Sequence, residues 1–319
     1  MKTAMPPTSG DCVITVRDLT KKYGDLLAVD HVSFCIRRNE IFGFLGPNGA
    51  GKTTTVRMLV GLTNITSGEA RIDGLDVIRD YKRVRSIIGV VPDISNLYSE
   101  LTSLQNLLFS AAMYGVPKKE RLKRAESLLK FFGLWEKRDQ KFKNLSKGQK
   151  RRLTIAAALT HNPRILFLDE STSGLDVMSR RIVWRRIKEL NRSGVTIFLT
   201  THNVYEAFHI SDRIGIINKG RIVALGTPGE LERKFGAREV VEAAFQPHNP
   251  GIDELSRHIQ GALDIKLQGD RFKIVASNPM QVIESLVQYA RQRGLELSSL
   301  NLRGADAEEL FLQIIGGLQ

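Results

Sequence analysis

The stretch Ile41-Phe42-Gly43-Phe44-Leu45-Gly46-Pro47-Asn48-Gly49-Ala50-Gly51-Lys52-Thr53 decides the fold of this 319-residue chain. Its first five residues are apolar or glycine and predict a buried strand, and residues 53–60 have the spacing of a helix. The turn between them follows the pattern G-x-x-x-x-G-K-[ST], whose glycines allow the backbone to curl tightly. A buried strand that leads through a glycine-rich turn into a helix is typical of an α/β core.

The residue types in this turn suit the binding of nucleotide phosphates. Backbone N–H groups can surround the phosphates, and the N-terminus of the following helix adds partial positive charge. Lys52 can reach the terminal phosphates, and the Thr53 hydroxyl can bind Mg²⁺. The predicted nucleotide-binding residues of this loop are Gly46, Pro47, Asn48, Gly49, Ala50, Gly51, Lys52, Thr53 and Thr54.

A second part of the predicted site follows the apolar run 165–168, where Asp169 and Glu170 end a buried strand. Two acids in this position are conspicuous, because carboxylates are rarely found in apolar surroundings. We expect Asp169 to assist Mg²⁺ binding and Glu170 to polarise the attacking water as a general base.

The first 235 residues are predicted to form an α/β domain of three parts. Residues 13–16 and 32–36 are short β-rich runs that predict antiparallel strands. Residues from about 94 to 160 are dominated by helical spacing and predict a helical subdomain. The strands of a parallel, doubly wound core sheet are expected at 165–168, 196–199 and 214–217.

A second, smaller α+β domain is predicted for residues 236–319. The formal net charge is +16 over residues 1–235 and −3 over residues 236–319, which supports the division. The order of patterns suggests a ferredoxin-like βαββαβ unit with an added helix. The expected elements cover 239–245, 252–259, 262–267, 271–276, 279–292, 295–301 and 306–315.

Composition and cysteine content narrow the class of protein. Hydrophobic residues make up 42% and charged residues 25%, which is ordinary globular usage. No apolar run approaches the ~20 residues of a membrane helix, and residues 1–10 lack the apolar core of a secretory signal, so we expect the cytoplasm. Cys12 and Cys35 have neither metal-ligand spacing nor a disulfide framework, and we expect both to be packing residues in a reducing environment.

Four further motifs resemble those of the ATP-binding-cassette (ABC) ATPases, in the order of that family across residues 13–235. Leu-Ser-Lys-Gly-Gln at 145–149 resembles the family signature, and Ser-Gly-Leu-Asp at 173–176 resembles its D-loop. His202 is placed like the switch histidine, and Tyr23 like the aromatic residue that stacks on adenine. The resemblance implies a P-loop ATPase that uses ATP and Mg²⁺. Its catalytic residues would be Glu170, His202 and Lys52.

In that family the signature of one subunit closes over ATP held by the phosphate loop of another, which implies a homodimer with two shared sites. Ser146 can cap the helix that follows it, whose N-terminal N–H groups could then face a γ-phosphate. Ser146, Gly148 and Gln149 are therefore candidate ATP contacts. Separate transmembrane permease subunits and peripheral association with the cytoplasmic face of the cell membrane are expected. Residues 97–102 and the C-terminal extension resemble those of drug and polysaccharide exporters.

Two positions depart from the family pattern. Lys147 replaces a glycine, whereas Gly148, whose backbone would approach phosphate, is retained. Asp93 replaces a glutamine that senses Mg²⁺ and contacts the membrane subunit. A carboxylate can still bind metal, so Asp93 joins Thr53 and Asp169 as a candidate metal ligand. Because it has no amide donor, slower ATP turnover or a different coupling to the membrane subunit stays open.

Two other functions stay open from the sequence. The basic first domain would suit a soluble ABC ATPase that acts on ribosomes or DNA, although such proteins carry two cassettes or long coiled-coil insertions, which this chain lacks. Asp93 would suit a regulatory subunit that barely hydrolyses ATP, but Glu170 and His202 argue against it. No nucleic-acid partner is expected. A solvated helix face is expected for the basic cluster of Lys147, Lys150, Arg151 and Arg152.

Overall fold

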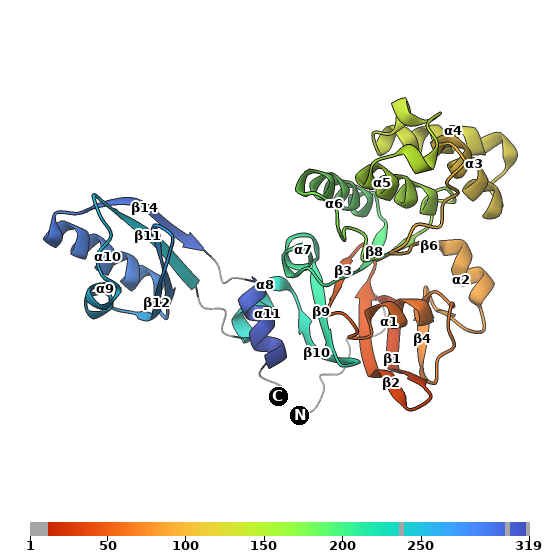
Figure 1. The fold of residues 1–319 in the computed structure, drawn as a ribbon. Coiled ribbons are helices and arrows are strands. Elements are labelled where there is room, and N and C mark those ends of the chain that lie inside the picture. The colour runs from red at the N-terminus through yellow and green to blue at the C-terminus, as the bar shows by residue number, and fades with distance from the viewer. Residues whose placement is uncertain (1–11, 236–238, 304–306, 317–319) are drawn as a thin grey trace. The chain divides into compact units, whose positions relative to one another are not determined.

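The computed structural model describes residues 12–235, 239–303 and 307–316 (Figure 1). Backbone contacts divide the chain into two compact units, residues 1–228 and 229–319. Within the described residues, no helix combines the length and the apolar character that a membrane span requires.

The first unit is built on a six-stranded sheet with the strand order β10-β9-β3-β8-β7-β6. Five neighbouring strands run parallel, and β10 is an antiparallel edge strand. The predicted parallel core is therefore confirmed. The strands are β3 (Ile41–Leu45), β6 (Ile88–Val91), β7 (Ile165–Asp169), β8 (Thr196–Thr201), β9 (Arg213–Asn218) and β10 (Arg221–Gly226).

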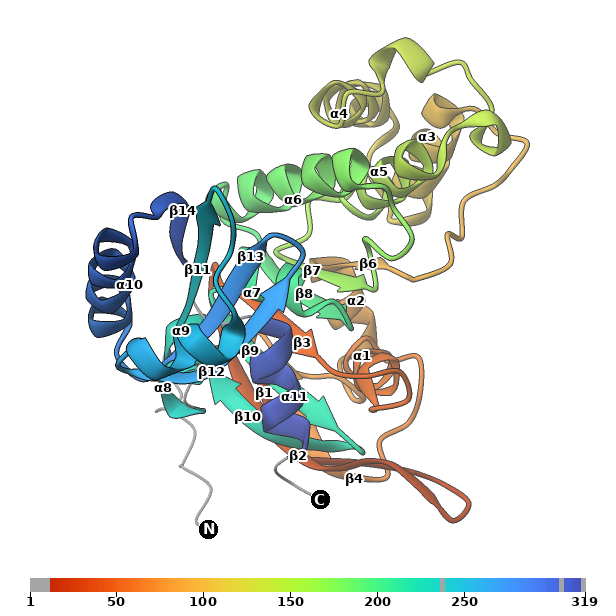
Figure 2. The same cartoon turned by 60° about the vertical axis from the view of Figure 1, so that its left-hand side comes forward.

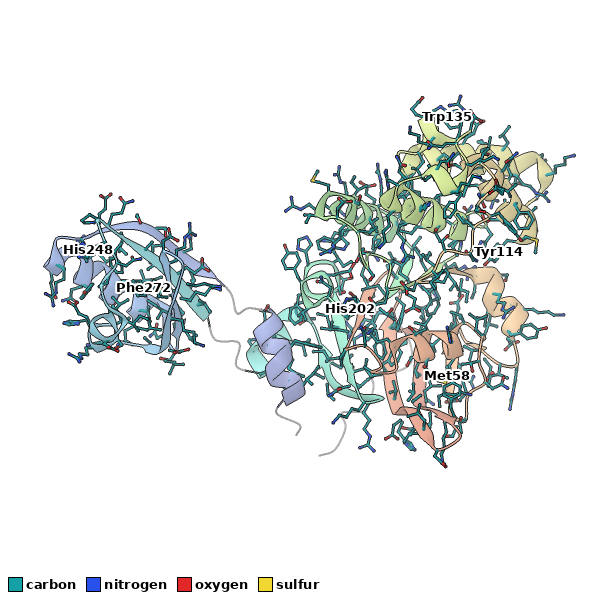
Figure 3. The ribbon with its side chains drawn as sticks, in the orientation of Figure 1. Met58, Tyr114, Trp135, His202, His248 and Phe272 are labelled. Atoms are coloured by element: carbon teal, nitrogen blue, oxygen red, sulfur yellow. A yellow bond between two sulfur atoms is a disulfide. The ribbon has the colours of Figure 1, made fainter. Side chains whose placement is uncertain are left out.

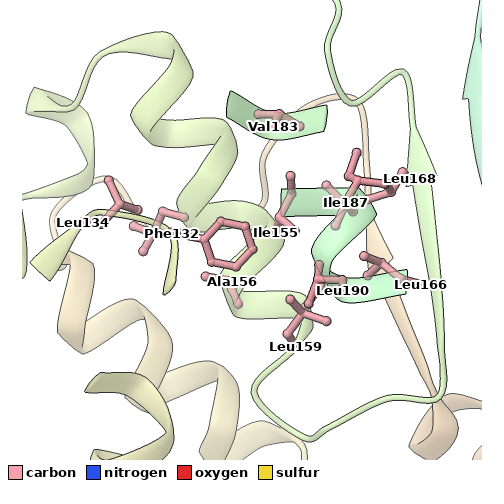
Figure 4. Packing of buried hydrophobic residues seen from close by; sticks show 14 of the residues in the cluster. Phe132, Leu134, Ile155, Ala156, Leu159, Leu166, Leu168, Val183, Ile187 and Leu190 are labelled. Carbon is pink, nitrogen blue, oxygen red and sulfur yellow. The ribbon is translucent and has the colours of Figure 1, made fainter. Parts of the chain in front are cut away.

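Both faces of this sheet are covered, as the continuous apolar runs of its strands predict. On β7, Leu166 and Leu168 pack in one cluster with helices α5 (Lys147–Ala158) and α6 (Val177–Arg192), which Figure 4 shows from close by. Alternate residues of β7 belong to a second cluster with α1 (Lys52–Leu59) and the antiparallel strands. The carboxyl ends of the parallel strands are thereby held between two packed layers.

A four-stranded antiparallel sheet of order β2-β1-β4-β5 forms part of the second cluster. Strand β1 pairs with β2 through contacts such as Ile14 with Ile36, so the predicted antiparallel strands are confirmed. Each is longer than the β-rich run that predicted it. The strands are β1 (Cys12–Tyr23), β2 (Leu26–Arg37), β4 (Ser67–Ile72) and β5 (Leu75–Asp76).

The expectation that the two cysteines are unpaired packing residues is wrong. Cys12 and Cys35 form a disulfide, with Cα atoms 5.8 Å apart. Strand pairing is the physical reason, because the β1–β2 register and its bulge after Cys12 bring the two residues together. A separation of 23 positions along the chain gave no sign of this contact.

The predicted helical part of the first unit consists of α3 (Ser103–Met113), α4 (Lys118–Phe131), two short 3₁₀ helices (Trp135–Lys137 and Phe142–Asn144) and α5. Figure 4 shows Phe132 and Leu134, which follow α4, packing beside Ile155 and Ala156 of α5. Two shorter helices, α2 (Tyr81–Ile87) and α7 (Val204–Ile210), precede β6 and β9. Helix α5 therefore belongs both to the helical part and to the layer that covers the sheet.

The second unit contains an antiparallel sheet of order β12-β13-β11-β14. This is the strand order of the predicted ferredoxin-like fold, and α9 and α10 pack on one face of the sheet (Figures 1 and 2). The elements are α8 (Pro228–Lys234), β11 (Glu239–Gln246), α9 (Ile252–His258), β12 (Ala262–Gln268), β13 (Arg271–Ala276), α10 (Pro279–Arg293), β14 (Glu296–Arg303) and α11 (Ala307–Gly316).

Candidate nucleotide-hydrolysis site

The phosphate loop joins β3 to α1, and its shape depends on glycine. Gly49 and Gly51 have φ angles of 79° and 105°, which side-chain-bearing residues rarely adopt. A Cβ on Gly46 would lie 2.4 Å from the carbonyl oxygen of Ile217, and one on Gly51 would lie 2.6 Å from that of Ala28. The backbone therefore curls against β9 and β2 in a way that larger residues would prevent.

Lys52 begins α1 and is buried, with its ammonium group inside the loop. It donates to the carbonyl oxygens of Gly46 at 2.7 Å and Pro47 at 3.1 Å. It also forms an ion pair with Glu170, with 3.2 Å between Nζ and Oε1. The ammonium group is thus positioned by the loop that the sequence predicts to hold phosphates.

Two carboxylates complete this part of the site at the end of β7. Asp169 is buried and its Oδ1 accepts hydrogen bonds from Thr53 at 3.2 Å and from Thr200 of β8 at 2.6 Å. The next carboxylate, Glu170, has its Oε2 2.8 Å from Nδ1 of His202. Figure 3 labels His202 in the first unit. The structure therefore brings Lys52, Thr53 and both acids to one place, with the histidine beside them.

The backbone of Glu170 has an unusual conformation. Its φ angle is 48°, in the left-handed region that non-glycine residues seldom occupy. Its N–H group donates to the carbonyl oxygen of Thr200 at 3.2 Å and approaches the hydroxyl of the same residue at 3.1 Å. Conformations of this kind persist only where the surrounding structure enforces them, and they cluster at functional sites.

The signature residues begin α5. Ser146 and Gln149 form a reciprocal capping box, with hydrogen bonds of 2.9 and 3.3 Å. Gly148 packs against α6 so closely that a Cβ would lie 2.4 Å from Oγ of Ser179. Among the hydrogen bonds of the described residues, none joins Ser146 to the phosphate loop of its own chain.

Lys147 is exposed and extends over the turn that resembles the D-loop. Its Nζ lies 2.2 Å from the place where a Cβ at Gly174 would stand, and Gly174 has a φ angle of 62°. The lysine that departs from the family signature therefore occupies space that a glycine in the neighbouring turn leaves free.

Two predicted site residues, Tyr23 and Asp93, are exposed to solvent. The ring of Tyr23 is exposed, with Nζ of Lys21 4.7 Å from its centre. The side chain of Asp93 is 59% exposed, and its Oδ1 lies 3.8 Å from Nη2 of Arg151. The contact of the Asp93 carboxylate is thus with an arginine on α5.

The prediction of a solvated basic face on α5 is wrong for two of its four members. Arg151 is only 9% exposed and donates to backbone carbonyls, and Arg152 donates to the carbonyl oxygen of Phe132 at 2.7 Å. The helical spacing of the sequence could have indicated the burial of Arg151. It stands three positions after Gly148 and four before Ile155, so the three residues share a helix face, and all three are buried. Sequence reasoning also missed Thr200, which contacts both Asp169 and Glu170.

Comparisons with known sequences agree with this geometry. Residues 29–173 match the family described as ABC transporter. The chain is 34% identical over 306 residues to the linearmycin resistance ATP-binding protein LnrL of Bacillus subtilis, covering 95% of this chain and 98% of that protein. It is 35% identical over 319 residues to the Nod factor export ATP-binding protein I of Ralstonia nicotianae, covering 99% of this chain and 98% of that protein.

Solved structures share the fold of the first unit. The cbiO1 protein from Clostridium perfringens, part of the ABC transporter complex cbiONQ, matches with a TM-score of 0.65 at 29% identity, over 70% of this chain and 92% of that chain. A dimeric ATP-binding cassette in a post-hydrolysis state, bound to ADP and Pi, matches with a TM-score of 0.61 at 29% identity, over 67% of this chain and 98% of that chain. The predicted family and fold are confirmed. The chain belongs to the ABC transporter family and is an ATP-binding, ATP-hydrolysing subunit.

Proposed function

We propose that this chain works as a homodimer on the cytoplasmic face of a membrane, where its ATP hydrolysis drives export through separate transmembrane subunits. Two relatives support export, because their names refer to Nod factor export and linearmycin resistance. The observation that carries the chemistry is the position of Glu170 between Lys52 and His202, at 3.2 and 2.8 Å. In this proposal residues 1–235 form the nucleotide-binding domain and residues 236–319 an accessory domain.

The residues of the site fit ATP and Mg²⁺. Because Gly46 and Gly51 carry no side chain, the loop can pack against the carbonyl oxygens of Ile217 and Ala28 and keep the tight curl that backbone phosphate binding requires. Thr53 Oγ1 and Asp169 Oδ1 are 3.2 Å apart and are oxygen donors of the kind that Mg²⁺ prefers. These two residues would hold the ion, with Asp93 as a further candidate ligand. Bound Mg²⁺ would neutralise charge on the phosphate oxygens.

The proposed catalytic roles follow from the contacts of each side chain. Lys52 would exchange its carbonyl acceptors for phosphate oxygens and so bind the end of the triphosphate. Glu170 would accept a proton from the attacking water, because it is the carboxylate that does not bond to Thr53 or Thr200 through its side chain. His202 would hold the other oxygen of Glu170 and fix the orientation of the carboxylate. Tyr23 would stack on the adenine.

A second copy of the chain would complete each site. Ser146 is exposed and caps a 12-residue helix whose first N–H groups suit an anion. The dimeric state of a cassette with 29% identity supports this arrangement. The γ-phosphate held by Lys52 of one copy would then meet the Ser146 end of α5 from the other.

A surface near Asp93 suits a membrane partner. Ile94, the residue after Asp93, is 83% exposed, and Tyr98 and Phe109 are also exposed. The rings of Tyr98 and Phe109 meet edge to face, with 4.9 Å between their centres, at a depression of about 450 Å³. Large exposed apolar side chains that lie together mark interaction sites. The depression is lined by Tyr98, Ser99, Glu100, Leu101 and Phe109.

Replacing the proposed general base tests the catalytic assignment. Glu170→Gln keeps the size of the side chain and removes its basicity, so turnover should fall by roughly 10²–10⁴-fold while ATP still binds. Phosphate release and equilibrium binding of a fluorescent ATP analogue measure the two quantities on purified protein. Steady-state turnover at the wild-type rate in Glu170→Gln would refute this role.

A further inference from the structure

Arg151 lies on α5 five residues after Ser146, and its guanidinium group is buried beside the catalytic cluster. Nη1 donates to the carbonyl oxygen of Pro92 at 2.7 Å. Nη2 donates to the carbonyl oxygens of Asp93 at 2.9 Å and of Glu170 at 3.2 Å. One side chain therefore bonds to the backbone of two segments that are nearly 80 residues apart in the sequence.

The two segments follow neighbouring strands. Pro92 comes directly after β6 and Glu170 directly after β7, and these strands pair in parallel with Val91 opposite Leu168. The guanidinium group thus bridges the carboxyl ends of both strands. Its planar donors suit this task, because they can bond to several carbonyls at fixed angles at once.

The carbonyl that Arg151 holds belongs to the residue with the left-handed backbone. The N–H group of Glu170 is fixed by Thr200 of β8, and the carbonyl oxygen of Glu170 is fixed by Arg151 of α5. Together these bonds clamp the peptide units on both sides of its Cα. They can therefore enforce a φ angle that would otherwise relax, and with it the direction of the carboxylate.

A buried cation is unfavourable unless its donors are satisfied and acids lie near it. Three carbonyls satisfy Arg151, and Oδ1 of Asp93 lies 3.8 Å away. Burial lowers the pKa of Arg151, while the charges of Asp93, Asp169 and Glu206 act to raise it. The family usually has glutamine at position 93. Here the Asp93 carboxylate lies near the guanidinium group of Arg151, which also donates to the carbonyl oxygen of Asp93.

We propose that Arg151 is a positioning residue that fixes the backbone of Glu170 and ties it to the Pro92–Asp93 segment and to α5. A movement of α5 would then shift the backbone of Glu170 directly, through the hydrogen bonds of the Arg151 guanidinium group and not through the sheet. This inference rests on the proposed role of Glu170. Arg151 itself need not contact ATP.

A double-mutant cycle tests the proposal. Arg151→Lys keeps the charge but cannot bridge both strands, so kcat should fall by about 10–100-fold, the cost of a misplaced catalytic group. Affinity for a fluorescent ATP analogue should change by less than about threefold, because the phosphate loop is intact. When Arg151→Lys is added to Glu170→Gln, the residual turnover should also change by less than about threefold, since Arg151 acts through Glu170.

The matched control is Arg152→Lys. Arg152 is the next residue of the same helix, and it bonds to the carbonyl oxygens of Phe132 and Gly148 rather than to the ends of β6 and β7. Its variant should stay within about threefold of wild type in kcat and affinity. Arg151→Gln, which buries no charge, repeats the cycle if Arg151→Lys fails to give folded protein.

The outcomes separate the two proposals. Wild-type kcat in the folded Arg151 variants, or an equal loss in the wild-type and Glu170→Gln backgrounds, would overturn the positioning role alone. Full turnover in Glu170→Gln itself would instead remove the general base, and the inference about Arg151 with it. A loss that disappears in the Glu170→Gln background supports the positioning role.

Discussion

Gly148 sets how closely two helices can approach at the signature end of α5. A Cβ at this position would lie 2.4 Å from Oγ and 2.7 Å from Cβ of Ser179 on α6. Gly148→Ala is therefore expected to lower the free energy of unfolding by about 1–3 kcal/mol, the usual cost of overpacking. Denaturant unfolding of the purified chain measures this change.

Ser179→Gly provides the matched control, because it removes the atoms that a Cβ at Gly148 would meet. Alone it should cost about 1 kcal/mol, since glycine is a poor helix residue. The double variant should then lose less stability than the two single losses added together. Strictly additive losses would show that the two positions do not touch.

Individual site residues were predictable from the sequence where the signal is local. Lys52 and Thr53 stand in one short motif, and Asp169 and Glu170 end an apolar run, so their meeting follows from parallel strands in one sheet. Contacts between distant segments gave no such signal. Arg151 looked like one of several surface cations, because the carbonyls that bind it come from other parts of the chain.

At the scale of elements, periodicity identified strands and helices well, but it did not identify pairing. The apolar runs of β3, β7 and β8 predicted a buried parallel sheet, because every position of these strands is covered. The disulfide between β1 and β2 depends on their register, which neither run reveals by itself. Pairing is a property of two segments, and single-segment patterns cannot contain it.

His161 connects the end of α5 to the neighbouring elements and makes folding stability depend on pH. Its ring stacks on Tyr114 at 3.8 Å between centres, and its Nε2 lies 2.9 Å from the carbonyl oxygen of Ile88. Burial is the main cause that lowers the pKa of His161, and the charge of Arg124 adds to it, while the hydrogen bond with Ile88 acts to raise it. The folded protein therefore binds a proton on this ring less readily than the unfolded chain does.

The sign of the pH effect follows from this lowered pKa. Above the unfolded pKa of about 6.5 both states are neutral, whereas below it the unfolded chain binds a proton that the folded chain resists. Wild-type stability should thus fall as the pH drops from 7.5 to 5. His161→Gln cannot titrate, so the stability advantage of wild type over this variant should shrink over the same interval. Urea unfolding at both pH values measures it, and a constant difference would contradict the lowered pKa.

At the scale of the whole molecule, the proposed dimer assigns residues of one site to two chains. Lys52 and Glu170 lie 3.2 Å apart and would belong to the same half of a site, whereas Ser146, which bonds to Gln149 of its own helix, would face the partner's nucleotide. Lys52→Ala should inactivate the loop half of every site. Ser146→Glu should inactivate the signature half, because it puts a carboxylate where the γ-phosphate would bind.

Mixing the two inactive chains should restore activity. In a mixed dimer, one site combines both defects, but the other combines an intact Lys52 with an intact Ser146. If chains exchange freely, half of the dimers are mixed, so turnover should recover to about a quarter of the wild-type value. The control mixes Lys52→Ala with Glu170→Gln, whose defects lie in the same half, so no mixed dimer gains an intact site. Recovery in the control, or its absence in the first mixture despite chain exchange, would mean that the site is not shared between chains.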